Sequence, residues 1–247
     1  MADPTKLTLV YDNLITDSSM ITASSEATNY GKANLIDKAY QTCWRSTGVT
    51  SESLLIDLGS AKSIKAFILG NHNLFAEVTT LNLKYGTTDA CADGTVDISD
   101  DLTENDFIHF LDSLSYRYWK LEIAGSTNIT FYSIGELWLS TYVELDKNPL
   151  ANVSPYDKEH VAHEEGLHAY NLYSYIDWPL EWGNYNNSVN HDKLLALWNT
   201  VKKARPFWIM LDPSEDSTLK YVVIREFSFN QFLGVGYPGR MRVVNSL

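Results

Sequence analysis

Apolar and polar residues alternate over short stretches in the first 143 residues of the chain. The stretch "VTTLNLKYG" places Leu81, Leu83 and Tyr85 on one face and polar residues on the other, the period of a half-buried β-strand. The runs "SLLIDLG", "SIKAFILGN", "DFIHFLD" and "YRYWKLEIAG" have strand length, and Gly, Asn, Asp and Ser separate them. No long helical period occurs before residue 145. This half is therefore predicted to be all-β, with the strand spacing of a sandwich.

The second half contains one stretch with a helical period, "NHDKLLALWNTVKKARP". Leu194, Leu197 and Val201 share one face, Asn190 is in position to cap the N-terminus, and a proline follows the lysines at the end. The pattern predicts a helix over residues 191–204.

The stretches around that helix, "LHAYNLYSYIDWPLEW", "FWIMLD", "KYVVIREFSFNQF" and "RMRVVNSL", indicate strands. Residues 161–247 are therefore expected to form a small β-barrel or sandwich with one α-helix. Two prolines and the lack of a period place a linker at residues 144–160, after a first domain at 1–143.

Charge narrows the choice of partners. The 247-residue chain has a formal net charge of −12, and most of the acidic excess lies before residue 144. An acidic surface with no basic stripe repels phosphate backbones, so we expect no nucleic-acid partner. No apolar run approaches the roughly 18 residues of a spanning helix, and the first residues lack the apolar segment of a signal peptide. We expect synthesis in the cytoplasm, exit only by assembly or lysis, and no membrane insertion.

Two cysteines, Cys43 and Cys91, are interpreted as free thiols, with Cys43 as a small buried residue beside Trp44. A nucleophilic cysteine needs a histidine and an orienting group, which the sequence does not place. Trp44 itself is interpreted as a core residue at the rim of the sandwich, with a sugar platform as the alternative.

Residues 87–106 form an acidic tract with seven carboxylates. The spacing of the aspartates does not fit a calcium loop of the Asp-x-Asp-x-Asp-Gly type, and the terminal bidentate glutamate is missing. A solvated surface loop is the favoured interpretation.

Four segments together resemble a known domain: "ITASSEATNYGKANLIDKAYQTCWRS", "LLIDLGSAKSIKAFIL", "YRYWKLEI" and "IGELWL". In order and spacing they are similar to the discoidin domain (coagulation factor type C, galactose-binding-like) over about residues 8–143. The resemblance implies an N-terminal jelly-roll β-sandwich.

The same resemblance implies a structural calcium ion with Asp37, Thr42 and Glu136 as ligands, completed by backbone carbonyls. Lys38 and Ala39 stand where the family has a glycine and a second acid, and a lysine lowers the local negative potential. Asp37 acting only as a turn-capping carboxylate is the alternative.

Loops at one end of this fold bind sugars or lipids in many relatives, and here the candidates for glycan binding are Tyr30, Arg45, His72, Asn73 and Phe75. An aromatic residue beside His and Asn in "GNHNLF" suits stacking on a sugar ring and bonding to its hydroxyls. The alternative is a strand-end loop whose phenylalanine packs inward and whose asparagines cap turns. The long aromatic loops by which some relatives insert into membranes are not evident.

The second half, with "WPLEW", "ARPFWIMLDP" and "YVVIREFSFNQF", resembles β-barrel domains of bacteriophage tail proteins. The resemblance implies a non-enzymatic virion or prophage tail protein, whose partners are copies of itself, other tail proteins and host-surface glycans. The candidate aromatic anchors of such assembly are Trp178, Trp182, Trp198, Phe207 and Trp208, of which at least half are expected to be core residues. The alternative is a stand-alone carbohydrate-binding module protein that partners a polysaccharide-active enzyme.

The stretches that could carry catalytic residues do not fit the spacing of known catalytic motifs. In "HVAHEEGLH", the histidines at 160, 163 and 168 lack the i, i+4 spacing of a metalloprotease helix. "GVGYPG" lies between strands and indicates a turn, and the acids Glu136, Asp177 and Glu181 have no defined separation for glycoside cleavage. The sequence therefore predicts that the protein is not an enzyme, with a metal-dependent hydrolase as the weakest alternative.

Overall fold

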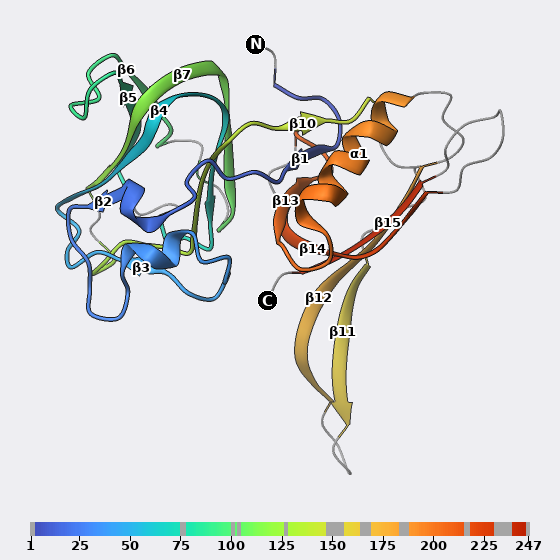
Figure 1. Cartoon of the computed structure of the whole chain (residues 1–247). Helices are drawn as coiled ribbons and strands as arrows, with labels where there is room; N and C mark the ends of the chain where they lie inside the picture. Colours follow the sequence, from blue (N-terminus) through green and yellow to red (C-terminus); the bar gives the residue numbers. More distant parts are fainter. Residues whose placement is uncertain are drawn as a thin grey trace.

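A computed structural model gives the arrangement of the chain. The residues that it describes are 3–74, 78–99, 102, 105–125, 128–146, 156–163, 169–182, 188–214, 218–229 and 239–245. These residues form β-strands and a single α-helix, apart from two short 3₁₀ turns, so the predicted all-β class is confirmed. Figure 1 shows a curled sandwich on one side and a second sheet carrying the helix on the other.

Two long strands organise the sandwich. β4 (Ser51–Gly70) pairs antiparallel with β7 (Phe107–Ala124), and the register breaks between Asp57 and Lys62. Before the break β4 also pairs with β2, and after it β4 pairs with β9. Because irregularities of this kind bend and twist strands, the same two strands contribute to both parts of the sandwich.

The other sandwich elements are short. β5 pairs with the end of β7, β6 pairs with β5, and β3 pairs with β8 in a separate two-stranded ladder. Their bounds are β2 Ile21–Ala23, β3 Trp44–Arg45, β5 Thr80–Gly86, β6 Gly94–Asp97, β8 Ser133–Ile134 and β9 Glu136–Ser140, with 3₁₀ turns η1 Ser18–Met20 and η2 Lys32–Leu35.

The core of the sandwich draws on both ends of the long strands. Leu54 and Ile56 come from the first part of β4, Phe67 and Leu69 from its second part, and Trp44 from β3. All five side chains are fully buried. Trp44 is thus a core residue, and the alternative of a sugar platform is wrong.

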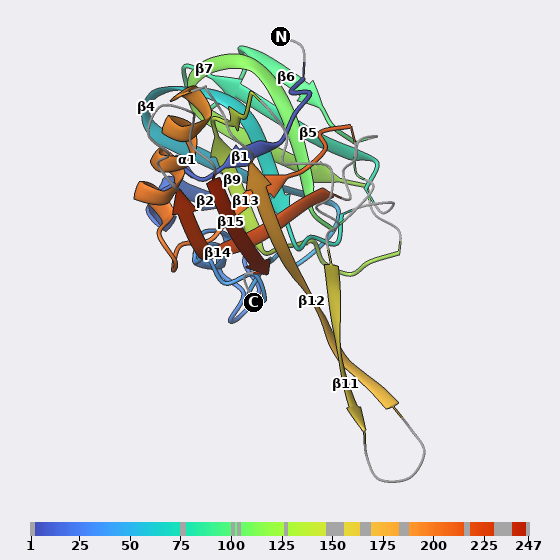
Figure 2. The same cartoon turned by 90° about the vertical axis from the view of Figure 1, so that its right-hand side faces the viewer.

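The second sheet has seven strands in the order β10-β1-β13-β14-β15-β12-β11. Its neighbours are antiparallel throughout, and Figure 2 shows the β11–β12 hairpin projecting from the body. The bounds are β1 Thr8–Val10, β10 Val143–Glu144, β11 Tyr156–His163, β12 Ala169–Trp182, β13 Phe207–Met210, β14 Leu219–Phe229 and β15 Gly239–Asn245.

Central strand β13 is buried on both of its faces. Phe207 and Ile209 pack with Leu194 and Leu197 of helix α1 (Ser188–Val201), while Trp208 joins a cluster that faces the sandwich. Burial on both faces explains why "PFWIML" is a continuous apolar run rather than an alternating one. The sheet therefore lies between the helix and the sandwich.

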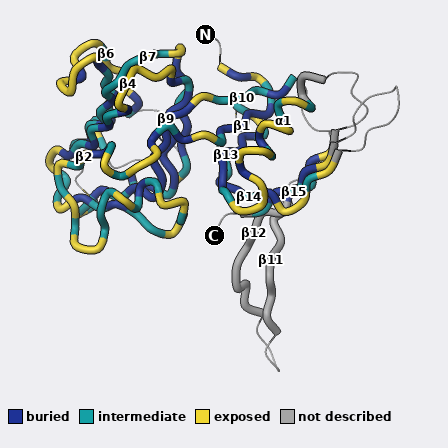
Figure 3. Tube along the Cα trace, viewed as in Figure 1, coloured by how far each residue is buried: buried dark blue, intermediate teal, exposed yellow. Residues whose placement is uncertain are grey.

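On the side of the sandwich, residues of β4 and β9 make this contact. Ala66, Ile68 and Trp138 belong to the same buried cluster as Trp208 and Met210. Figure 3 shows the buried colouring continuing across the place where the two units meet. The two units therefore share one apolar seam.

Strand pairing crosses the predicted domain boundaries. β1, at residues 8–10, and β10, at 143–144, both belong to the sheet of the second half, although the sequence placed residues 1–143 in the first domain. β11 begins at Tyr156, inside the predicted linker of 144–160, whereas residues 147–155 lie outside the described part. Short strands such as "TLV" carry no signal of which sheet they join, since pairing is a long-range property.

The helix begins at Ser188 and ends at Val201, three residues earlier at both ends than the predicted range of 191–204. Asn190 therefore lies inside the helix and not at its cap. No helix in the described ranges has the length and apolar character needed to cross a membrane.

Gly70 allows a close approach across the seam. A Cβ atom at this position would lie 2.6 Å from two ring carbons of Trp208, a fully buried side chain. We predict that Gly70→Ala lowers the free energy of unfolding by about 1–3 kcal/mol, because the indole must move within a packed core. Urea unfolding followed by tryptophan fluorescence measures this. Gly48→Ala is the matched control, since its Cβ meets only Glu52 Oε1 at 3.9 Å; equal stability of both variants would contradict the prediction.

Candidate functional site

Arg45 is held between two aromatic rings at the surface of the sandwich. Its guanidinium carbon lies 3.8 Å from the ring centroid of Tyr30 and 4.8 Å from that of Phe131. All three residues are partly exposed. Stacking of this kind fixes a guanidinium group while leaving its edge donors directed outward.

The short β3–β8 ladder explains the orientation of Arg45. Trp44 pairs with Ile134 and Arg45 pairs with Ser133. Because side chains alternate along a strand, Trp44 and Ile134 are buried in the core while Arg45 and Ser133 are partly exposed. Burial of Trp44 in the core thus fixes the position of the adjacent Arg45 at the surface.

Backbone bonds hold the aromatic partners in place. The Arg45 N–H donates to the Tyr30 carbonyl at 3.0 Å. Asn73 donates from Nδ2 to the Phe131 carbonyl at 3.0 Å and accepts at Oδ1 from the Ser133 N–H at 2.7 Å. The amide of Asn73 therefore fixes the segment that carries Phe131. Arg45 is also held through its side chain, because its Nε donates to Cys43 Sγ at 3.4 Å.

His72 lies inside the protein and not at the surface. Only 3 % of its area is exposed, and Nδ1 accepts a hydrogen bond from the Leu74 N–H at 3.2 Å. Burial lowers the pKa of the imidazole to about 4, so the ring is neutral at pH 7. His72 therefore fixes the loop "GNHNL" from within.

Of the five residues proposed to bind a glycan, the structure brings Tyr30 and Arg45 into contact and gives Asn73 a supporting position. Phe75 lies outside the described residues. Sequence reasoning missed Phe131, whose only signal was its place beside Tyr132 in "FYSIGELWL". Tyr132 is fully buried, whereas Phe131 is partly exposed.

Cys43 and Cys91 are both free, but their burial differs from the expectation. Cys43 is partly exposed beside Arg45, and Cys91 is the buried thiol. Cys91 has a positive φ of 50°, and burial raises the pKa of its thiol. The buried position of Cys91 lacks the accessible setting of a reactive thiolate.

The predicted calcium turn has a definite geometry. Thr42 Oγ1 lies 2.7 Å from Asp37 Oδ2 and 2.9 Å from the Ala39 carbonyl oxygen, and the Ala39 N–H donates to Asp37 Oδ1. One hydroxyl hydrogen cannot serve both acceptors fully, so three oxygens converge in a way that a hard cation would satisfy. Lys38 adopts a φ of 66°, which keeps the tight turn that a glycine makes easily.

Glu136 is the third predicted calcium ligand, and it is completely buried. Its Oε2 accepts from Trp138 Nε1 at 3.0 Å. Burial raises the pKa of Glu136 to about 7; the indole N–H opposes this rise and the negative charge of Asp37 adds to it. Two acids close enough to affect each other fit a cation, and the calcium site stays a prediction.

The other candidate chemistry is not assembled in the described part of the chain. His160 and His163 lie on strand β11 and not on a helix, while His168 lies outside the described residues. Within the described ranges, no three His, Cys, Asp or Glu side chains gather around a metal position. Glu181 is exposed and pairs with Arg240 at 3.4 Å.

No protein-family model and no curated protein matches the sequence. Solved structures are similar over about half of the chain. The CBM32 domain of AlyQ, in complex with 4,5-unsaturated mannuronic acid, is 21% identical with a TM-score of 0.41, covering 53% of this chain and 96% of that one. The lectin domain of lectinolysin with Lewis B antigen is 14% identical (TM-score 0.44; 52% and 95% covered), and a fucose-binding module of Streptococcus pneumoniae is 16% identical (TM-score 0.44; 53% and 99% covered).

His72 gives the fold a specific sensitivity to acid. Its pKa is about 4 in the folded chain and about 6.5 when unfolded, so between these values only the unfolded chain takes up the proton. We predict that the stability contribution of neutral His72 is complete above pH 6.5 and is lost as the pH falls to 4, at a cost of about 3 kcal/mol. Urea unfolding from pH 7.5 to 4 should show a smaller slope in His72→Asn, which keeps an acceptor for the Leu74 N–H. An identical slope in both proteins would refute this.

The calcium hypothesis predicts a rise in thermal stability. At a hundredfold excess over its dissociation constant, a ligand of the folded state contributes about 2.7 kcal/mol, or about 5–10 °C for a chain of this size. We expect calcium to raise the melting temperature by this amount, and Asp37→Ala to abolish the rise. Differential scanning calorimetry after treatment with a chelator measures it, with Asp57→Ala as the control. Equal melting temperatures with and without calcium would show that Asp37 only caps the turn.

Proposed function

We propose that the chain is a non-enzymatic carbohydrate-binding protein, and that Arg45, Tyr30 and Phe131 form its sugar-contacting surface. The observation that carries the proposal is the guanidinium held between two aromatic rings. Sugars present vicinal hydroxyls and apolar ring faces, and this surface offers a fork of N–H donors beside aromatic planes.

The availability of the donors supports this role. Arg45 uses Nε toward Cys43, and its two terminal nitrogens make no hydrogen bond to any described residue. Asn73 is committed to the backbone and His72 is buried, so both would support the site from behind. Sugar binding is also what the names of the similar solved structures state for those proteins.

The role in a virion tail remains a prediction from the resemblance of the second half. The same holds for tail-protein partners, self-assembly and location in the virion. Three of the five aromatic residues expected to anchor assembly, Trp178, Phe207 and Trp208, are buried in the chain itself. Trp198 stacks on Phe227 at 4.9 Å between centroids, and the side chain of Trp182 lies outside the description. Carbohydrate binding, with a polysaccharide-active partner, is the function that the described surface favours.

Replacing Arg45 tests the proposal. A glycan array with the full chain identifies the best sugar, and isothermal titration calorimetry then measures its affinity. We expect Arg45→Gln to weaken binding about 10- to 100-fold, because hydrogen bonds from a charged donor contribute about 1.5–3 kcal/mol each.

Arg117→Gln is the matched control. Arg117 also stacks on a tyrosine, Tyr118 at 4.7 Å, but its Nε and Nη2 donate to both oxygens of Asp57 at 2.7 and 2.8 Å. Its donors are therefore occupied, and its loss should leave sugar affinity unchanged. An array without any bound glycan, or equal affinity of Arg45→Gln and the wild type, would overturn the proposal.

A further inference from the structure

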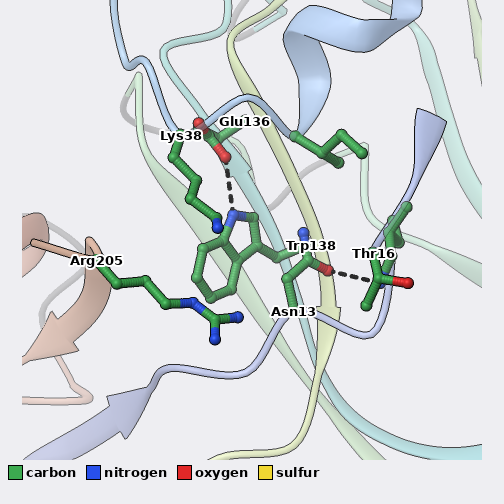
Figure 4. Close-up of a pocket in the computed structure, with 8 residues that line it drawn as sticks. Asn13, Thr16, Lys38, Glu136, Trp138 and Arg205 are labelled. Carbon is green, nitrogen blue, oxygen red and sulfur yellow. Dashed lines mark hydrogen bonds between the residues drawn. The ribbon is translucent and has the colours of Figure 1, made fainter. Parts of the chain in front are cut away.

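A pocket of about 210 Å³ opens where the sandwich meets the second unit, and none of its lining residues belongs to the Arg45 surface (Figure 4). Arg205 reaches it from the segment after helix α1, and the other lining residues come from the sandwich and the chain that leads into it. The lining residues are Asn13, Ile15, Thr16, Ile36, Lys38, Glu136, Trp138 and Arg205. The pocket is thus complete only when both units are folded together.

One wall is a buried acid with an unused acceptor. Glu136 Oε2 bonds to Trp138, but Oε1 is buried and accepts no hydrogen bond from the described residues. The Lys38 N–H and the Tyr221 hydroxyl face the carboxylate and stabilise its charge, yet neither makes a bond of full geometry to Oε1. A buried acceptor without a donor is costly, so this oxygen favours a ligand that supplies one.

Two cationic side chains, Arg205 and Lys38, also line the pocket. Arg205 Nε is buried and donates no hydrogen bond within the described part of the chain, and its Nη2 lies 3.8 Å from Asp12 Oδ1. Lys38 forms no ion pair with any described residue, and Figure 4 shows its ammonium group beside the Trp138 indole. A buried Nε donor and a nearby ammonium favour an anionic group.

Asn13 adds no binding capacity, because its amide is used within the fold. Nδ2 donates to the Leu137 carbonyl at 2.9 Å, and Oδ1 accepts from the N–H groups of Ile15 and Leu139. The unused groups are therefore one acceptor and two cationic donors. A simple inorganic anion would leave the Glu136 acceptor unmatched, and a neutral sugar would leave the cations unmatched.

We propose that this pocket binds a small hydroxycarboxylate, whose carboxylate lies between Arg205 and Lys38 and whose hydroxyl donates to Glu136 Oε1. The volume equals that of about seven water molecules, which suits an acid of three to six carbons. The proposal is independent of sugar binding at Arg45, because the two sites share no residue.

Three probes, each with three carbons, separate the two requirements. D-glycerate has both a carboxylate and hydroxyls, glycerol lacks the carboxylate, and propionate lacks the hydroxyls. We expect saturable binding of glycerate to the full chain, at least tenfold tighter than that of glycerol or propionate. Isothermal titration calorimetry in the presence of a calcium chelator measures this without competition from a cation at Glu136.

Variants assign the binding to the pocket. Arg205→Gln should weaken glycerate binding at least tenfold, and Lys38→Gln serves as a second test because Lys38 is exposed and its loss leaves the core intact. Arg45→Gln should leave glycerate affinity unchanged. No saturation by glycerate, equal binding of the three probes, or full affinity in folded Arg205→Gln and Lys38→Gln would overturn the proposal.

Discussion

The contact of β13 with the sandwich is the constraint on which the rest of the structure depends. Trp208 packs against Tyr221 with ring centroids 4.7 Å apart, and Tyr221 in turn meets the edge of Trp138 at 6.1 Å. These rings and the aliphatic side chains of Ala66 and Ile68 form one buried cluster contributed by both units. Burial of the apolar surface of this cluster stabilises each unit, and it occurs only when the other unit is packed against it. The two halves therefore behave as one folding unit.

This seam changes how the parts of the chain relate to function. The first strand, β1, pairs with β13, and the chain then enters the sandwich, where Asn13 bonds to the backbone at both Leu137 and Leu139. A fragment of residues 1–143 would expose Trp138 and lose the partner of β1. The second half therefore covers a face of the domain that carries Arg45.

Local sequence patterns predicted the strands well because alternation and turn residues act over a few positions. They identified β5, the helix and the burial of Trp44. They could not assign β1 to the distant sheet, because Thr8 meets Met210 across two hundred residues of chain. At the candidate site they found Arg45 and Tyr30 but misplaced His72, whose polar side chain is buried by long-range packing. Phe131 was missed because only the β3–β8 pairing brings it beside Arg45.

Glu136 belongs both to the predicted calcium site and to the pocket beside Arg205. Its strand neighbours Leu137 and Leu139 lie in the sandwich core, so the opposite face of β9, with Glu136 and Trp138, must turn toward the second unit. A carboxylate there is removed from water, and its raised pKa reflects that cost. An apolar residue would fill the same place more favourably unless something binds to the acid. Binding of the predicted cation at Asp37, or of the proposed organic acid beside Arg205, would offset the cost of this buried carboxylate.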